Sequence, residues 1–293
     1  GDQVEGHGRS PGIDAEARAT AALTSPHTIA VYDYGRAEDG SFYYVMELLD
    51  GLDLETLVTR HGRLPPERAV YLLVQICDSL HDAHRQGLVH RDIKPANIMI
   101  CRQGAERDFV KVLDFGLVKL EPTAQSSDDA DDEAKLTAEG VPLGTPAYMA
   151  PEVARGHEAT PLSDVYAFGC VAYWLLAGRL VFADARGAVG QLVAHGQDPP
   201  ESIADHVDLS GELTDLVMAC LEQDPAQRPS SMAVVQRRLH DTDLAERWTR
   251  THSHEWWSEI DLPALLDPEV ELEGALDSSD PALLATMEAP SDQ

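Results

Sequence analysis

The sequence has few basic residues for its length. Its 293 residues include 22 Lys and Arg against 51 Asp and Glu, which gives a net charge of −29. A nucleic-acid-binding protein needs a basic surface that displaces counterions, so this composition argues against nucleic acid as a partner. It also argues against docking on an anionic lipid surface. No apolar run reaches the roughly 18 residues of a membrane span, so we expect no membrane segment in this chain.

Cysteine is scarce and scattered. The four cysteines contain no CxxC pair, which argues against a disulfide framework and against a zinc site. The N-terminus lacks a basic segment followed by an apolar stretch, which is the pattern of a signal peptide. Both observations favour a cytoplasmic protein.

Lysine is especially rare. Only four lysines occur, the first at Lys94 and the last at Lys135, so residues 1–93 offer no side-chain ammonium group. The chain also begins with Gly1 rather than Met. We interpret this start as the mark of a fragment, a crop or a processed product.

Hydrophobic periodicity predicts a small strand-containing segment followed by a mostly helical body. Residues 29–34 and 42–46 are rich in β-branched and aromatic residues and are predicted strands, joined by a turn at 38–40. Over 66–86 the apolar residues follow the i, i+3, i+4, i+7 pattern of an amphipathic helix. Residues 163–177 are apolar on nearly every face, as in a helix inside a core. Further strands are predicted over 97–101 and 109–113, and further helices over 187–195, 211–222 and 230–240.

Three segments have the composition of disordered or mobile chain. Residues 1–15 are rich in Gly, Asp and Pro without any period, and 121–140 form a polar, acidic loop. After Arg250 there is no Lys or Arg, while acidic residues recur to the end. We therefore expect 245–293 to be an acidic, largely disordered tail. Within it we expect a short docked segment around Trp248, Trp256 and Trp257.

The strongest chemical signal is a set of three short motifs in a fixed order. They are His90-Arg91-Asp92-Ile93-Lys94-Pro95-Ala96-Asn97, then Asp114-Phe115-Gly116, then Gly144-Thr145-Pro146-Ala147-Tyr148-Met149-Ala150-Pro151-Glu152. Each motif alone is a weak signal, but together, in this order and spacing, they are highly specific.

Phosphoryl transfer explains the residue types in these motifs. A triphosphate with Mg²⁺ needs hard oxygen ligands, which Asn97 and Asp114 can supply. A hydroxyl nucleophile needs a carboxylate to orient it and accept its proton, and Asp92 is the candidate. Lys94, two residues further on, can reach the transferred phosphate and offset its charge.

At these motifs the sequence resembles the eukaryotic-like protein kinases, specifically the bacterial serine/threonine kinases, over residues 16–243. Lys94 stands where kinases of the Ser/Thr type carry lysine. The resemblance implies an α+β, protein-kinase-like fold, with a small N-lobe of helix αC and a few strands on a mainly helical C-lobe. It implies ATP and Mg²⁺ as cofactors and a protein with a Ser or Thr acceptor as substrate. The expected parts are a disordered segment (1–15), a residual N-lobe and hinge (16–48), the C-lobe (49–244) and the tail (245–293).

The resemblance also assigns roles to individual residues. Asp114 would chelate Mg²⁺, and Asn97 would hold the second metal ion. Thr145 would lie beside Asp92 and Lys94 in the substrate-binding loop. The positions matching the adenine site are Met46 as gatekeeper, Glu47 and Leu49 through their hinge backbone, and Met99 beneath the ring.

Four residues match positions that support the family's catalytic machinery. Asp164 would accept backbone hydrogen bonds beneath the catalytic loop, which His90 would brace. Glu152 would pair with Arg228.

Three further residues match regulatory positions. Glu16 matches the glutamate of helix αC. Arg91, immediately before Asp92, is typical of kinases that need a phosphate on the activation loop, and Thr137 is the preferred acceptor. Autophosphorylation would bring two copies of the chain together as a homodimer.

His81 and His84 could pair as metal ligands at helical spacing. A structural role close to the catalytic loop explains both of them better.

The sequence departs from the family at its start. The family places a Gly-rich loop and a strand lysine before helix αC, whereas only 15 residues precede Glu16 and none is lysine. The glycines of 6–12 lack the GxGxxG spacing. We therefore expect a truncated N-lobe, weak Mg-ATP binding, and slow or no phosphoryl transfer by this chain. The alternative is a pseudokinase that acts as a protein-binding scaffold. A small-molecule kinase of related fold is disfavoured by the Ala-Pro-Glu segment and Arg228.

Overall fold

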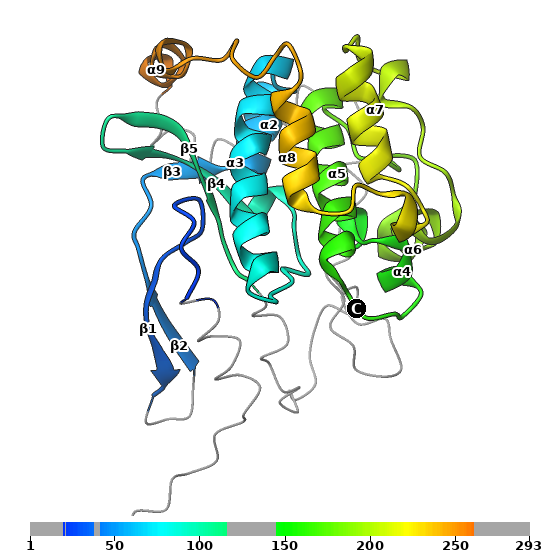
Figure 1. The fold of residues 1–293 in the computed structure, drawn as a ribbon, viewed down its shortest axis with the longest axis horizontal. Coiled ribbons are helices and arrows are strands. Elements are labelled where there is room, and N and C mark those ends of the chain that lie inside the picture. The colour runs from blue at the N-terminus through cyan, green and yellow to red at the C-terminus, as the bar shows by residue number, and fades with distance from the viewer. Residues whose placement is uncertain (1–19, 21, 38–41, 116–144, 261–293) are drawn as a thin grey trace, which may run out of the picture.

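A computed structural model describes residues 20, 22–37, 42–115 and 145–260 (Figure 1). Within these ranges a short pair of strands stands beside a larger body made mostly of helices, and the predicted α+β fold class is confirmed. Glu16 and Thr137, the N-terminal segment 1–15 and the acidic loop 121–140 lie outside the described residues.

The strand pair consists of β1 (Val31–Arg36) and β2 (Phe42–Met46). The two strands run antiparallel, with Val31 opposite Met46, and they match the predicted strands over 29–34 and 42–46. Ile29 joins the pair to the body because its N–H donates to the carbonyl of Val112 at 3.0 Å. The strand-rich lobe that the resemblance implies is therefore present as two strands in the described part of the chain.

A three-stranded antiparallel sheet lies next to this pair. Its strands, in spatial order, are β3 (Gly51–Asp53), β4 (Ile98–Gln103) and β5 (Glu106–Val112). The short 3₁₀ helix η1 (Pro95–Asn97) leads directly into β4, and β5 ends two residues before Asp114. The β4–β5 hairpin therefore places Asn97 and Asp114 at the same end of the sheet.

Helices form the rest of the body, and the predicted helices over 66–86, 163–177, 187–195, 211–222 and 230–240 are all found. The helices are α2 (Leu54–His61), α3 (Pro66–Arg85), α4 (Pro151–Ala154), α5 (Pro161–Ala177), α6 (Gly187–Gln197), α7 (Gly211–Cys220), α8 (Met232–His240) and α9 (Arg250–Glu259). Between them, within the described ranges, lie the 3₁₀ turns η3 (Pro146–Tyr148), η4 (Ile203–Asp205) and η5 (Pro225–Gln227).

Helix α5 forms the centre of the body. Its start is defined by a capping box, in which the Thr160 side chain accepts from the helix N-terminus and Ser163 bonds back to the Thr160 N–H. Gly178 ends it in the left-handed conformation, with φ of 72°. Nearly every side chain between these ends is buried, and α3 and α7 pack against the helix. The pattern of apolar residues on all faces is therefore explained by burial inside the core.

Helix α9 occupies the first part of the stretch that we expected to be a largely disordered tail. Trp256 and Trp257 of this helix, and Trp248 just before it, contact the body, as expected for a docked segment around these residues. The described fold therefore continues past the C-lobe boundary expected at 244, as far as Ile260.

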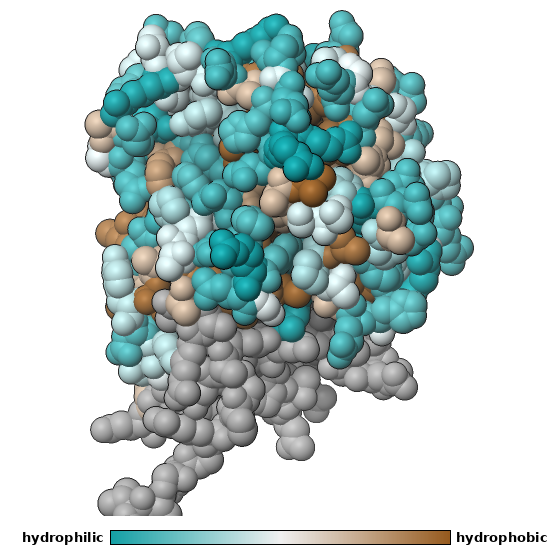
Figure 2. Space-filling model, in the orientation of Figure 1, coloured by the Kyte–Doolittle hydropathy of each residue, from teal (hydrophilic) through white to brown (hydrophobic). Residues whose placement is uncertain are grey.

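The surface in Figure 2 is mostly hydrophilic, with hydrophobic residues scattered over it in small areas. All four cysteines are buried and free. Across the described ranges, no helix is both long enough and apolar enough to cross a membrane.

A buried ion pair links α4 to the segment between η5 and α8. Arg228 donates to both carboxylate oxygens of Glu152 at 2.8 Å, and the Ser163 hydroxyl donates to the same carboxylate at 2.8 Å. The Arg228 guanidinium also donates to three backbone carbonyls, those of Leu162, Glu222 and Gln223. The structure thus brings together the two residues that the sequence predicted to pair.

Replacing Arg228 by Met should lower the free energy of unfolding by about 3–5 kcal/mol, because the Glu152 carboxylate would stay buried without its cation. Urea denaturation measures this change. Arg247→Met is the control, since Arg247 forms an exposed pair with Asp243, and its loss should cost less than about 1 kcal/mol. Equal costs for the two variants would contradict the importance of the buried pair.

The pH dependence of stability should report the same carboxylate. Burial alone would raise the pKa of Glu152, but the hydrogen bonds from Arg228 and Ser163 outweigh it and lower the pKa below its ordinary 4.5. The stabilising contribution of the Glu152 carboxylate is therefore complete above pH 4.5 and is lost as the pH falls through its folded-state pKa. The stability difference between the wild type and Glu152→Gln should be full at neutral pH and shrink below pH 4.5. A difference that grows in acid would contradict this assignment.

Candidate active site

The candidate catalytic loop is held by one buried carboxylate. Asp164 lies in the first turn of α5 and is almost completely buried. Its Oδ2 accepts the N–H of His90 at 2.8 Å, and its Oδ1 accepts the N–H of Arg91 at 3.0 Å. His84, on α3, contacts the same Oδ2 through Nε2 at 2.8 Å. His84 thus has a structural partner, in agreement with the structural interpretation of its sequence position.

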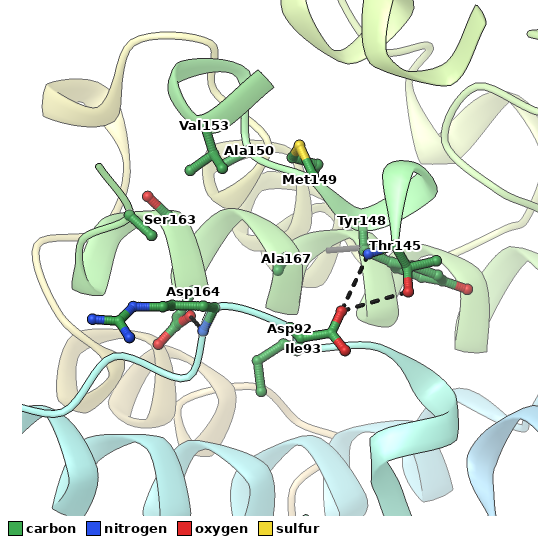
Figure 3. Close-up of a pocket in the computed structure, with 12 residues that line it drawn as sticks. Asp92, Ile93, Thr145, Tyr148, Met149, Ala150, Val153, Ser163, Asp164 and Ala167 are labelled. Carbon is green, nitrogen blue, oxygen red and sulfur yellow. Dashed lines mark hydrogen bonds between the residues drawn. The ribbon is translucent and has the colours of Figure 1, made fainter. Parts of the chain in front are cut away.

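The backbone of the loop is strained at Arg91. Its φ of 71° lies in the left-handed region, which costs a residue with a side chain roughly 1 kcal/mol or more. The hydrogen bond to Asp164 holds Arg91 in this conformation. The Asp92 side chain, next in the loop, points toward Thr145 at the start of η3, as Figure 3 shows.

Asp92 lies at the centre of a compact polar cluster. The N–H of Thr145 donates to Asp92 Oδ1 at 3.2 Å, and the Thr145 hydroxyl lies 3.5 Å from the same oxygen (Figure 3). Lys94 Nζ lies 2.8 Å from Asp92 Oδ2. Asn97 Nδ2 donates to the Asp92 backbone carbonyl at 2.8 Å and to Oδ2 at 3.1 Å. The structure therefore brings together all four residues that the sequence nominated for catalysis.

These contacts keep the Asp92 carboxylate ionised. Burial by itself would raise the pKa of Asp92, but the hydrogen bond from Lys94 and the N–H of Thr145 together lower it below its ordinary value. An ionised carboxylate beside a lysine can accept a proton from a hydroxyl group while the ammonium balances nearby negative charge.

His90 makes a contact through each of its two ring nitrogens. Its Nε2 donates to the carbonyl of Leu113 at 2.7 Å, and its Nδ1 accepts the N–H of Asp92 at 3.3 Å. Burial lowers the pKa of His90, which favours the neutral ring. The ring of Phe115 packs against it with centroids 4.6 Å apart. His90 therefore connects the catalytic loop to the segment that carries Asp114.

The two candidate metal ligands lie on adjacent strand ends. The N–H of Leu113 donates to the carbonyl of Asn97 at 2.9 Å, which sets Asp114 next to Asn97. Asp114 has a φ of 54°, so the chain turns sharply at this residue. Because Asn97 Nδ2 is used by Asp92, its Oδ1 is the atom of the carboxamide suited to a cation. One carboxylate and one amide oxygen suit Mg²⁺, which typically takes few protein ligands together with phosphate oxygens. Among the described residues, no cluster of three or more His, Cys, Asp or Glu offers a different kind of metal site.

The candidate hinge is fixed by an ion pair that the sequence analysis missed. Glu47 Oε1 accepts from Lys111 Nζ at 2.6 Å and from the N–H of Ala30 at 2.8 Å. Lys111 is almost completely buried in β5, directly opposite Met99 of β4, and also donates to the carbonyl of Thr28. The sequence signal that could have revealed this pair is a lysine between two valines of a predicted strand, in a chain with four lysines.

Candidate site residues line two of the clefts in the described part of the chain. One lies between the strand pair and the Asp114 segment, and Met46 contributes to its largely apolar wall. Its lining residues are Thr20, Ile29, Val31, Tyr44, Met46, Asp114 and Phe115. The other cleft, drawn in Figure 3, lies between the catalytic loop, η3, α4 and α5, and is lined in part by Asp92, Thr145, Tyr148, Met149 and Val153. Leu49, expected to contribute its backbone to the hinge, lies between β2 and β3.

Comparison with known proteins identifies the family. The protein kinase domain family matches residues 4–239, and the chain belongs to this family. Its relatives include the serine/threonine-protein kinase pkn3 of Myxococcus xanthus, which is 39% identical over 235 residues, covering 79% of this chain and 42% of the relative. PknA of Mycobacterium tuberculosis is 39% identical over 218 residues, covering 73% of this chain and 47% of the relative. These relatives place the chain among the eukaryotic-like Ser/Thr kinases of bacteria, and it spans less than half of their length.

Solved structures agree with this fold. The structure of Rad53 residues 1–466 in complex with AMP-PNP is 28% identical, with a TM-score of 0.61 over 78% of this chain and 54% of that chain. The kinase domain of Mycobacterium tuberculosis PknI is 23% identical, with a TM-score of 0.58 over 79% of this chain and 78% of that domain, which supports the fold alone.

A double-mutant cycle on Lys111→Met and Glu47→Gln tests the hinge ion pair. We expect a coupling energy of about 1–3 kcal/mol from urea denaturation, because either single variant leaves a largely buried polar group without its partner. The exposed pair of Asp50 and Arg102 provides the matched control, and its cycle should give less than about 1 kcal/mol. Additive effects of Lys111→Met and Glu47→Gln would show that the pair is energetically unimportant.

Proposed function

We propose that this protein transfers the γ-phosphoryl group of Mg-ATP to Ser or Thr hydroxyls of proteins. The observation that carries this proposal is the position of Asp92, which Lys94, Asn97 and Thr145 contact together. Membership of the protein kinase family supports the same reaction.

Asp92 acts as the base in this proposal. Its lowered pKa keeps it ionised at neutral pH, so it can orient the acceptor hydroxyl and take its proton as the oxygen attacks phosphorus. Lys94 offsets charge on the transferred group, and Thr145 keeps the carboxylate in position on the side of the substrate cleft.

Asn97 and Asp114 would hold Mg²⁺ through oxygen atoms. When bound, the ion supplies positive charge to the phosphates. The adenine ring would lie between Met46 and Met99, with the backbone of Glu47 and Leu49 as hydrogen-bonding partners. A related fold binds AMP-PNP in the Rad53 structure, which supports a nucleotide as the ligand of this fold.

Regulation in this proposal centres on Arg91 and Thr137. A phosphate on Thr137 would neutralise Arg91, and transfer between two copies of the chain would require a transient homodimer. Glu16 would act as the glutamate of helix αC. Phosphopeptide mapping of active protein tests this part, and a phosphate-free 116–144 segment in active protein would contradict it. The four free, buried cysteines support a cytoplasmic location.

A second candidate is a pseudokinase that binds proteins as a scaffold. Residues 1–93 contain no lysine, so this stretch offers no ammonium group to the phosphates of a nucleotide. For the same reason we expect this chain to bind Mg-ATP more weakly than micromolar. Calorimetry that gives a micromolar dissociation constant would contradict this expectation.

Radiolabelled ATP with Mg²⁺ and a generic basic protein tests the proposed reaction. We expect slow incorporation by the wild type, reduced about 100-fold or more in Asp92→Asn, because the variant cannot accept the proton. Asp215→Asn is the matched control, since Asp215 is exposed on α7, and it should retain wild-type incorporation. Equal incorporation by Asp92→Asn and the wild type would refute the role of Asp92. No incorporation by a folded wild type would favour the scaffold.

A further inference from the structure

Helix α9 lies beyond the part of the chain that matches the kinase family, yet it is bound to the body through specific polar contacts. The family match ends at residue 239, and α9 begins at Arg250. Figure 1 shows α9 beside the turn between β4 and β5, at the opposite end of the molecule from β1 and β2. We name residues 248–257 the C-terminal clasp.

Asp108 of β5 is the centre of this contact. Its side chain is fully buried. Arg68 of α3 donates to it from Nε at 2.9 Å and from a terminal nitrogen at 2.7 Å. The indole N–H groups of Trp248 and Trp257 donate to its two oxygens at 2.9 and 2.8 Å. Two of the four donors to this carboxylate therefore come from the clasp.

The clasp also covers the positive partner. The Arg68 guanidinium lies 3.8 Å from the ring centroid of Trp256 and 5.2 Å from that of Trp248, within the range of cation–π attraction. Three of the protein's four tryptophans thus enclose one ion pair. A buried ion pair is stable only when its remaining hydrogen-bonding groups also have partners. At Asp108 the clasp provides these partners as two indole N–H donors.

The clasp holds the tip of the β4–β5 hairpin as well. Arg250 donates to the carbonyl of Ala105 at 2.8 Å and lies 3.0 Å from the Glu106 carboxylate. His254 Nε2 lies 2.9 Å from the same Ala105 carbonyl. The turn that joins the two strands is therefore contacted by the clasp at three points.

A bulge in β5 explains why Asp108 faces the clasp. Cys101 pairs with Phe109, but Gln103 pairs with Glu106, so Arg107 and Asp108 together oppose a single residue of β4. Asp108 has a φ of 53°, in the left-handed region. A bulge interrupts the alternation of side chains between the two faces of a strand, so the bulged residue points to a different face than regular pairing would give it. The strained backbone at Asp108 is held in place by the four donors to its side chain.

A short series of hydrogen bonds connects Asp108 with the candidate nucleotide site. Gln75 donates from Nε2 to the Asp108 carbonyl at 3.0 Å and accepts the N–H of Val110 through Oε1 at 3.0 Å. The strand then continues through Lys111, which contacts Glu47, to Leu113, whose N–H bonds the Asn97 carbonyl. One strand thus has the clasp at its start and Asp114 just after its end.

We propose that the C-terminal clasp is a positioning element for the nucleotide site, acting through Asp108 on β5. Releasing the clasp would free the bulge at Asp108 and loosen the strand as far as Leu113, so that Lys111 and Asp114 lose their fixed places. The link to nucleotide rests on the proposed function, whereas the mechanical coupling along β5 is independent of it.

Hydrogen exchange of the full chain, read by NMR at single amides, tests the coupling. Trp257→Phe keeps an aromatic side chain but removes the N–H donor to Asp108 together with the pyrrole part of the indole, a modest loss of volume that the fold should survive. We expect exchange to rise about tenfold or more at Val110, Val112 and Leu113, whose N–H groups are all hydrogen-bonded. Amides of α5 and α7 should keep wild-type rates. Trp174→Phe is the matched control, since Trp174 lies half-buried on α5, and it should leave these three amides unchanged.

Each other pattern of exchange would overturn the proposal. Faster exchange confined to residues 104–108 would mean that the clasp stabilises its own contacts only. Equal acceleration throughout the body would mean that it is ordinary core, and no change would mean that the Trp257 N–H is unimportant. Asp108→Asn provides a second variant that should accelerate the same three amides. None of these readouts needs ATP, so the coupling can fail while the proposed function stands.

If the wild type transfers phosphate, Trp257→Phe should raise the KM for ATP more than it lowers kcat. This result would support the link to nucleotide. A fall in kcat alone, with KM unchanged, would contradict it.

Discussion

The Asp164 carboxylate is the interaction on which the candidate active site depends. It lies in the first turn of the most buried helix and accepts the N–H groups of two successive loop residues. A buried carboxylate that loses such donors bears the full cost of its desolvation, so the loop has a strong reason to stay in place. Arg91 is therefore kept at positive φ, and Asp92 is directed toward Thr145 and Lys94. The placement of the proposed base is thus a consequence of how α5 is packed.

Buried pairs of opposite charge organise the rest of the body in a similar manner. Asp108 and Arg68 are separated by 40 residues in sequence, and Glu152 and Arg228 by 76. Both pairs are bidentate, a geometry that restricts orientation as well as distance. Basic residues are few in this chain, and two of its arginines are buried at the junctions between distant segments. Each pair fixes one relative placement of its segments, since an alternative packing would leave a charge buried alone.

Strand β5 connects these features. Its bulged start contacts α3 and the C-terminal clasp, its middle holds the hinge through Lys111, and the residues after its end include Asp114. The α9 helix follows the family-matched part of the chain and still contacts this strand directly. Strand β5 is therefore part of the kinase-like core and at the same time the surface on which the C-terminal helix α9 packs.

The sequence by itself determined the family, the fold class and the residues around Asp92. Short motifs with fixed spacing constrain local backbone and side-chain chemistry, so His90, Asp92, Asn97 and Asp114 could be assigned from their order along the chain. Periodicity located α3 because apolar spacing reports the buried face of a helix directly. A run of residues that is apolar on nearly every face located α5 as a helix inside the core. Only the tertiary structure decided the partners of Glu47 and Asp108. Lys111, Arg68 and the tryptophans reach them from segments far away in the chain. A docked segment around the tryptophans could be predicted from the sequence, but neither its partner nor the bulge at Asp108 could. Contacts of this kind depend on how whole elements pack, and packing is a property of the folded molecule and not of any short stretch of sequence.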